Sequence, residues 1–186
     1  MPSRTQIVCM HEGSKDSIDP VFIMRVLKDL APSWIRPSTG SNGILPRGYG
    51  GRDQLIASMP AELKVCLKRG SDTTLMVWAD LNHNMPDGDA LKREFWEAAH
   101  KAGIQPEEFD SVVFVFAKDR IENWVEFLNT GKTDERREGP RVEGKDAADA
   151  ARKLARMCVE NKPVDLPVSL QWSCRNWRKL VARMNR

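Results

Sequence analysis

The chain has 186 residues, 41% of them hydrophobic and 30% charged, which is the balance of an ordinary globular protein with one sizeable core. Its net charge of +3 is too small to indicate a nucleic-acid binder by itself. No apolar run approaches the roughly 20 residues of a membrane helix, and the start lacks the apolar stretch of a secretion signal, so we expect a soluble, cytoplasmic protein with no membrane partner.

The first predicted unit is a strand followed by a helix. Residues 6–11, QIVCMH, form a short apolar run with β-branched members that stops at Glu12-Gly13. A helix is expected from about Pro20 to Leu30, because apolar residues recur there at helical spacing and polar residues just before it can cap its first turn. An acidic residue therefore follows the first strand.

A long loop separates this unit from the next one. A short strand is expected around residues 33–36, followed by a loop from Ser38 to Gly51 that is rich in glycine, proline and small polar residues. Loops of this length in compact domains are usually functional or mobile, and exposed backbone N–H groups can receive a phosphate. A helix is then expected from about Arg52 to Lys68, with Pro60 as a candidate break.

The clearest strand in the sequence is TTLMVWAD, residues 73–80, which is apolar on both faces like a central parallel strand. A helix is expected over residues 90–102, then a buried strand over residues 111–117 that runs into the charged stretch KDR before another helix. Strands that alternate with helices predict an α/β fold with a mostly parallel sheet flanked by helices.

Three acidic residues fall at the carboxyl ends of the predicted strands, where such sheets bind ligands: Glu12, Asp80 and Asp119. Carboxylates gathered at one edge repel one another unless a cation lies between them, and hard oxygen ligands suit Mg²⁺ or Mn²⁺. We therefore predict a metal site there. Its candidate ligands are Glu12, Asp80, Asn82, Asp87 and Asp89. Asp87 and Asp89 can equally cap the helix that starts near Ala90.

The remaining residues are predicted to form a tail on the same domain. Residues 131–145 are polar and charged, which favours a flexible segment between an α/β domain over residues 1–130 and a helical region over residues 146–186. Two helices are expected in that region, at about 146–160 and 170–184.

Basic residues around the edge and in the tail are candidates for phosphate contacts. In the last helix the apolar residues recur at helical spacing, which favours docking on the sheet with the basic face exposed to solvent. The candidate nucleic-acid contacts are Arg47, Arg52, Lys118, Arg120, Arg175, Arg178, Lys179 and Arg183.

The motifs HEGSKDS after the first strand, ADLN with DGD beyond it, and FAKDRIENWVEFL resemble the Toprim domains of topoisomerases, primases, small ribonucleases and bacterial defence nucleases. The resemblance covers roughly residues 6–130 and includes small, stand-alone Toprim-like proteins. It implies that Asp80 is the main metal ligand and that Glu12 ligates the metal or acts as general acid/base on a phosphodiester. The chain departs from the family at Asn82, where a second aspartate is usual, so the metal should bind more weakly or use Asp87 or Asp89.

Three functions are compatible with these features. The leading hypothesis is a metal-dependent nuclease of the Toprim type in a bacterial defence or RNA-processing system, with a partner ATPase or another defence protein as an option. The first alternative is a catalytically silent Toprim-like module that binds a protein or nucleic acid, which Asn82 favours. The second is an unrelated α/β enzyme that uses the same acids and magnesium on a small phosphorylated molecule.

Overall fold

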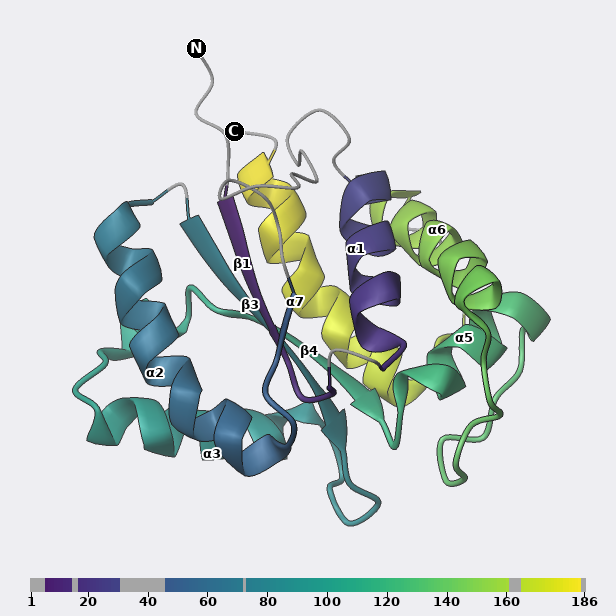
Figure 1. Cartoon of the computed structure of the whole chain (residues 1–186), viewed down its shortest axis with the longest axis horizontal. Helices are drawn as coiled ribbons and strands as arrows, with labels where there is room; N and C mark the ends of the chain where they lie inside the picture. Colours follow the sequence, from purple (N-terminus) through teal and green to yellow (C-terminus); the bar gives the residue numbers. More distant parts are fainter. Residues whose placement is uncertain (1–5, 15–16, 31–45, 72, 161–164, 185–186) are drawn as a thin grey trace.

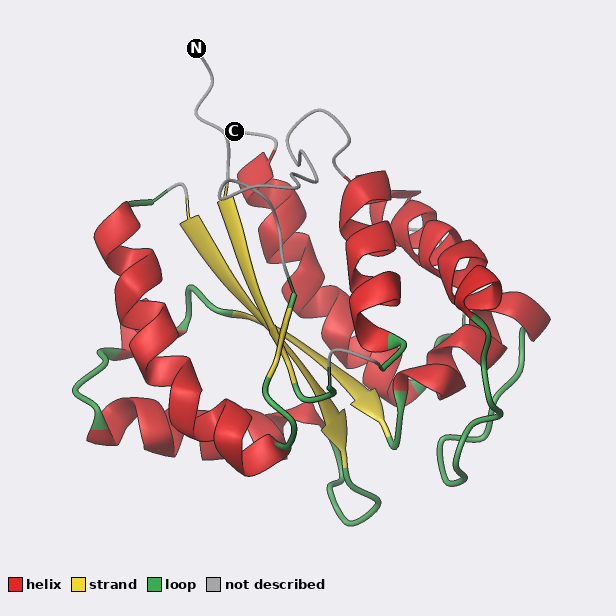
Figure 2. Cartoon of the chain, viewed as in Figure 1, coloured by secondary structure: helices red, strands yellow, loops and turns green. Residues whose placement is uncertain are grey.

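The computed structural model describes residues 6–14, 17–30, 46–71, 73–160 and 165–184. Within these ranges the chain folds around a four-stranded, all-parallel sheet in the order β2-β1-β3-β4 (Figure 2). The strands are β1 Gln6–His11, β2 Arg47–Gly48, β3 Thr73–Leu81 and β4 Val113–Lys118. The predicted α/β class with a parallel sheet is confirmed, and the arrangement is consistent with a Rossmann-like or Toprim-like fold.

Helices cover both faces of the sheet (Figure 1). One face carries α1 (Asp19–Leu30), α5 (Ile121–Thr130) and α6 (Gly144–Glu160). The other carries α2 (Arg52–Arg69), α3 (Gly88–Lys101) and the short α4 (Pro106–Phe109), and α7 (Val168–Met184) runs along β4. None of the helices within the described ranges is long and apolar enough to span a bilayer.

The two faces of β3 divide the core in two, because successive side chains of a strand point to opposite sides. Met76 and Trp78 belong to the cluster under α1, α5 and α6, whereas Val77 belongs to the cluster under α2 and α3. Trp78 makes edge-to-face contacts with Trp124 and Trp177, at centroid distances of 6.4 and 5.4 Å. Packing on both faces explains why the sequence of β3 is apolar almost throughout.

The structure differs from the expected elements at β2 and at Pro60. The strand expected at residues 33–36 lies outside the described residues, and the short parallel strand at Arg47–Gly48 was not foreseen. The break expected at Pro60 is wrong, because α2 continues through it. Pro60 is buried beside Met59 and Leu63, so tertiary packing offsets the backbone hydrogen bond that a proline inside a helix removes.

The segment between α5 and α6 has no helix or strand, yet it is fastened to the domain. The buried Asn123 donates through Nδ2 to Lys118 O (3.2 Å) and to Arg137 O (3.0 Å), and thereby ties the segment to the end of β4. Gly139 lies against Asn123 so closely that a Cβ there would come 2.7 Å from Oδ1. The polar composition of residues 131–145, which favours flexibility, does not reveal these attachments.

Helix α7 satisfies backbone groups of β4 with a side chain. Ser173 Oγ accepts from the N–H of Phe116 (2.9 Å) and donates to its carbonyl oxygen (3.1 Å), and all of these groups are buried. The ring of Trp172 stacks on Phe116 at 5.0 Å, and Ser169, one turn earlier, accepts from Trp124 Nε1 at 2.8 Å. The tail is therefore part of the domain core, which agrees with the expectation that it packs on the same domain.

We expect Ser173→Ala to lower the free energy of unfolding by about 1–3 kcal/mol, because it leaves a buried N–H and a buried carbonyl of Phe116 without their partner. Urea denaturation of both proteins measures the difference. Arg175→Ala, an exposed position on the same helix, is the matched control and should change stability by less than about 0.5 kcal/mol. Equal stabilities for the Ser173 variant and the control would contradict this role.

Candidate metal centre

Parallel pairing brings the ends of β1 and β3 together at one edge of the sheet. In their register, His11 lies opposite Trp78. Glu12 follows directly, and its backbone N–H donates to Trp78 O (3.1 Å) while its side-chain Oε2 accepts from the N–H of Asp80 (2.9 Å). Glu12 and Asp80 are thus neighbours across adjacent strand ends, as the sequence leads us to expect, and their role in binding metal stays a prediction.

The Asp80 carboxyl is in an environment that disfavours its charge. Burial, together with the carboxylates of Asp19, Glu12 and Glu122, raises the pKa of Asp80 well above its ordinary value. The guanidinium of Arg52 opposes this shift but does not cancel it. A negative charge at Asp80 therefore needs a further positive charge nearby, which a bound cation or a proton can supply.

Asp19, the first residue of α1, belongs to this acidic group although it is not among the metal ligands expected from the sequence. Its Oδ2 accepts from Ser17 Oγ at 2.6 Å and lies directly against Gly13, where a Cβ would collide with it. The absence of a side chain at Gly13 is what allows α1 to begin so close to the end of β1. Sequence spacing from Glu12 cannot show this approach, because the turn between them sets it.

Two further acids follow β4. Asp119 adopts the left-handed backbone conformation, with φ 64°, and its N–H donates to Leu81 O (2.9 Å). Its Oδ1 lies 3.2 Å from His83 Nε2. Glu122, in the first turn of α5, is half-buried, and its pKa is raised by burial and by the carboxylates of Asp19 and Asp119. Glu122 therefore shares the environment of the acids at the sheet edge.

Arg52 is the cation that holds the edge together. Its Nη2 donates to the backbone oxygen of Asp80 and lies 4.0 Å from Glu12 Oε2, and its side chain is only 14% exposed. A guanidinium engaged in this way fixes the ends of β1 and β3 relative to α2. The sequence suggested Arg52 as a nucleic-acid contact, but the structure places it where it positions the acids.

A small cavity of about 10 Å³, with space for roughly one water molecule, lies among these acids. It is lined by Glu12, Gly13, Asp19, Trp78, Ala79, Asp80, Ala117 and Ile121. Asp119 Oδ2, at the same sheet edge, is buried and has no hydrogen-bond partner among the described residues. His11, whose pKa is lowered by burial against the opposing effect of Asp19, also has both ring nitrogens unpartnered within the described chain.

The donor set fits a hard divalent cation. Within the described ranges, no group of three or more His, Cys, Asp or Glu side chains is arranged to hold a metal ion by protein ligands alone. Mg²⁺, however, is usually bound by one or two carboxylates and keeps water or substrate phosphate oxygens in its other positions. Glu12 and Asp80 supply two carboxylates of this kind, and Asp19 also lines the cavity without completing a set of three ligands.

The three other candidate ligands have different surroundings. Asp87 is the N-cap of α3 and accepts from the N–H groups of Asp89 (2.9 Å) and Ala90 (3.3 Å). Asp89 accepts from Trp172 Nε1 at 3.1 Å, which links α3 to α7. Asn82 is exposed in the loop after β3 and does not line the cavity among the acids. The structure therefore gives Asp87 the capping role that the sequence left open and gives Asp89 a structural partner.

The basic residues near the edge are mostly engaged within the protein. Arg47 lies 3.6 Å from Glu62 but keeps 64% of its side chain exposed. Lys118 donates to the backbone oxygens of His83 and Met85, which fastens the loop after β3. Arg120 pairs with Glu138. Of these three, Arg47 is the least committed to internal contacts.

The basic residues of α7 lie elsewhere. Ser169 contacts Trp124 of α5, and Ser173 contacts Phe116 in the middle of β4, so α7 runs from the carboxyl edge toward the amino edge of the sheet (Figure 1). At a rise of about 1.5 Å per residue, each further turn moves away from the acidic edge. Arg175, Arg178 and Lys179 are exposed on α7 beyond Ser173, and the side chain of Arg183 lies outside the described structure. The eight candidates thus fall into two separate groups.

A scan against protein-family models finds no match for this chain, and searches of curated proteins and of solved structures find none either.

We expect the stability of the protein to fall as the pH rises through the raised pKa of Asp80, because the folded state retains a proton that the unfolded chain releases near pH 3.8. This contribution to stability is fully present below pH 3.8 and is lost above the folded-state pKa. Asp80→Asn removes the ionisation, so the melting temperature at pH 8 should rise by about 2–4 °C for each kcal/mol relieved and should depend less on pH.

Thermal melts between pH 5 and pH 8, with and without Mg²⁺, measure this effect. Mg²⁺ should stabilise the wild-type protein at pH 8 but not Asp80→Asn, because a ligand stabilises the state that binds it. Asp53→Asn, an exposed acid in the first turn of α2, is the matched control and should keep the wild-type pH profile. A wild-type profile for Asp80→Asn would show that this carboxyl is not under strain.

Proposed function

We propose that this protein is a metal-dependent phosphodiesterase of the Toprim type that cleaves nucleic acid and uses Mg²⁺ or Mn²⁺. The observation that carries the proposal is the acidic edge, where the half-buried Asp80 lies among Glu12, Asp19 and Glu122 and the charge of Arg52 does not offset theirs. A role in a bacterial defence or RNA-processing system, with a partner such as an ATPase, is part of the same proposal and is based on the sequence resemblance.

Glu12 and Asp80 would hold the metal, and Asp19 is a third carboxylate at the same cavity. When bound, a divalent cation shields the charge of the phosphodiester that is attacked. Glu12 is suited to a fixed role, because the N–H of Asp80 and the guanidinium of Arg52 both lie at its Oε2. Its other carboxylate oxygen is then available either to ligate the metal or to exchange a proton with a reacting group.

The second candidate function is a catalytically silent module that binds a protein or nucleic-acid partner. Asn82 favours it, because this position follows β3 where Toprim domains usually carry a second aspartate, and its exposed amide adds no charge to the site. The two functions differ in one measurable property. A nuclease turns over its substrate in the presence of metal, whereas a silent module binds without cleavage.

We expect the purified protein to cleave at least one member of a panel of single- and double-stranded DNA and RNA in Mg²⁺ or Mn²⁺. Glu12→Gln and Asp80→Asn should each reduce the rate by about 100-fold or more, which corresponds to about 2.7 kcal/mol of lost transition-state stabilisation. Glu97→Gln, an exposed acid on α3, is the control for the charge change and should keep the wild-type rate.

Two variants in the loop and at the start of α3 sharpen this test. Asp87→Ala should lower the free energy of unfolding by about 1 kcal/mol, because it removes the N-cap of α3, while cleavage persists. If Asp87 were a metal ligand, the same variant would lose cleavage as well as stability. Asn82→Asp should tighten metal binding if the loop can reach the ion, because it adds a charge. Binding without any cleavage, in wild type and Asn82→Asp alike, would select the silent module.

Substrate binding should weaken steeply with salt, since each neutralised phosphate contributes a slope of about −0.9 in log K against log salt for duplex DNA and about −0.7 for single strands. Binding of labelled oligonucleotides in Ca²⁺ measures this slope without turnover. Arg47→Ala, beside the acidic edge, should reduce the slope by about one unit, whereas Arg175→Ala, on the distant part of α7, should leave it unchanged. The reverse result would place the nucleic acid along α7.

A further inference from the structure

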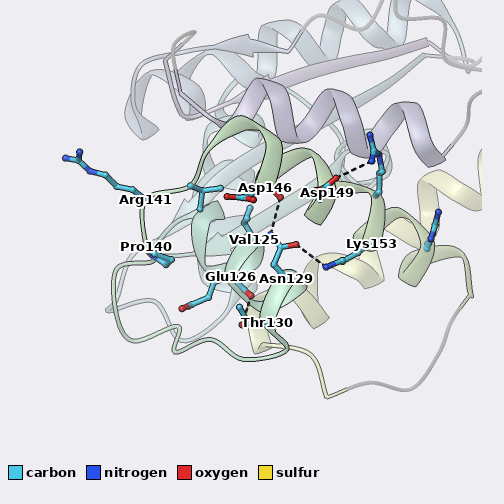
Figure 3. A pocket seen from close by; sticks show the side chains of 12 residues that line it. Val125, Glu126, Asn129, Thr130, Pro140, Arg141, Asp146, Asp149 and Lys153 are labelled. Carbon is cyan, nitrogen blue, oxygen red and sulfur yellow. Dashed lines mark hydrogen bonds and ion pairs between the residues drawn. The ribbon is translucent and has the colours of Figure 1, made fainter.

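A second cavity lies between α5, α6 and the segment that joins them, and it is separate from the acidic edge (Figure 3). Its volume is about 640 Å³, which falls within the range of about 300–1,000 Å³ typical of small-molecule sites. Val125, Pro140 and Val142 give it apolar surface, and the rest is lined by Glu126, Asn129 and Thr130 of α5, by Arg141, and by charged side chains of α6. A pocket of this size and mixed lining suits a ligand with both an apolar and a charged part.

The charges along the α6 side of this cavity are ordered. Asp146 and Asp149 lie in the first half of the helix, and Lys153 and Arg156 lie in the second half. Asp146 and Lys153 are seven residues apart, which is about 10 Å along a helix. Acidic residues near the start of a helix and basic residues near its end interact favourably with the helix dipole, which accounts for the order of the charges along α6. The dipole does not explain why a cavity lies between the acidic and the basic side chains.

A hydrogen-bond network fixes the base of the cavity. Asn129 of α5 donates through Nδ2 to Asp146 O (3.2 Å) and accepts through Oδ1 from Lys153 Nζ (3.2 Å), and Figure 3 shows it between these two residues. The ammonium of Lys153 is thereby held at one end of the cavity. Arg156 lies one turn further along α6 with no ion-pair partner among the described residues, so its guanidinium is available to an anion.

The acidic end complements this arrangement. Asp149 forms an ion pair with Arg152 at 3.2 Å, so each of these two residues already has a partner of opposite charge. The carboxylate of Asp146 has no ion pair within the described chain and lies beside the apolar surface. Arg141 also lines the cavity, and its side chain extends outward in Figure 3. The cavity thus offers two cations at one end and an acceptor for N–H or O–H groups at the other.

We propose that this cavity binds a nucleotide, with its phosphate at Lys153 and Arg156 and its nucleoside along Pro140 and Val142. The donors of the ribose or base then face Asp146. The lining matches three features of a ligand: a phosphate, an apolar ring face and hydrogen-bond donors. A nucleoside phosphate carries the phosphate at one end and the ring face and donors at the other. The site is independent of the proposed nuclease centre, so either can fail without the other.

The test is isothermal titration of the full chain with AMP, GMP, CMP, UMP and inorganic phosphate. At least one nucleotide should bind more tightly than phosphate alone. Lys153→Ala and Arg156→Ala should each weaken nucleotide binding by about ten-fold, because each removes a charge-assisted hydrogen bond. Both residues are exposed on α6, and alanine has a high helix propensity, so the two variants should keep the fold. Arg69→Ala, an exposed arginine at the end of α2, is the matched control and should bind like wild type.

Asp146→Asn separates the two ends of the site. It should weaken the nucleotide while leaving inorganic phosphate unchanged or slightly tighter, because only the nucleoside reaches that carboxylate. Asp80→Asn should bind the nucleotide like wild type, which distinguishes this cavity from the acidic edge. The proposal is overturned if none of the five probes binds, or if the Lys153 and Arg156 variants bind as tightly as the Arg69 control.

Discussion

The structure depends on one constraint, which is that parallel strands deliver all their carboxyl ends to the same edge of the sheet. Residues at the ends of β1, β3 and β4 are therefore brought to this edge, and in this chain they include Glu12, Asp80 and Asp119. The helices that return from this edge begin with acids as well, Asp19 and Glu122. Acids are favoured at helix N-termini, and here the acids of the helix N-termini lie at the same sheet edge as the acids of the strand ends. Arg52 offsets part of the resulting charge, but burial and the neighbouring carboxylates still hold the pKa of Asp80 above its ordinary value.

The sequence was sufficient for the parts of the fold that a local pattern specifies. The apolar run of β3 predicted a central strand, and the order of strands and helices predicted that Glu12 and Asp80 would be neighbours. It was not sufficient where tertiary contacts decide. A two-residue strand at Arg47–Gly48 has no pattern to detect, and Pro60 indicates a helix break unless the burial of its neighbours is known. The closeness of Asp19 to the edge depends on the turn at Gly13, which spacing alone does not describe.

The predicted site was likewise only partly specified by the sequence. Sequence identifies which side chains can hold a cation or a phosphate, but not which of them are already engaged. Asp87 caps α3, Lys118 fastens a loop, and Arg52 clamps two strand ends, so three residues with suitable chemistry have structural partners. The helical spacing of α7 correctly indicated docking on the domain, yet only the antiparallel course of α7 along β4 shows that its basic residues leave the acidic edge.

The pairing of Ser173 with Phe116 also bears on how this protein can associate with others. An outer strand of a sheet usually presents unpaired backbone groups that recruit a strand from another chain, by augmentation or by aggregation. On β4 a hydroxyl occupies both backbone groups of Phe116, and Trp172 covers the ring beside them. A partner that docks on this side must therefore recognise the outward side chains of α7 rather than add a strand. Chains shortened before α7 would expose β4 and become prone to self-association, so a tail truncation would change solubility as well as charge.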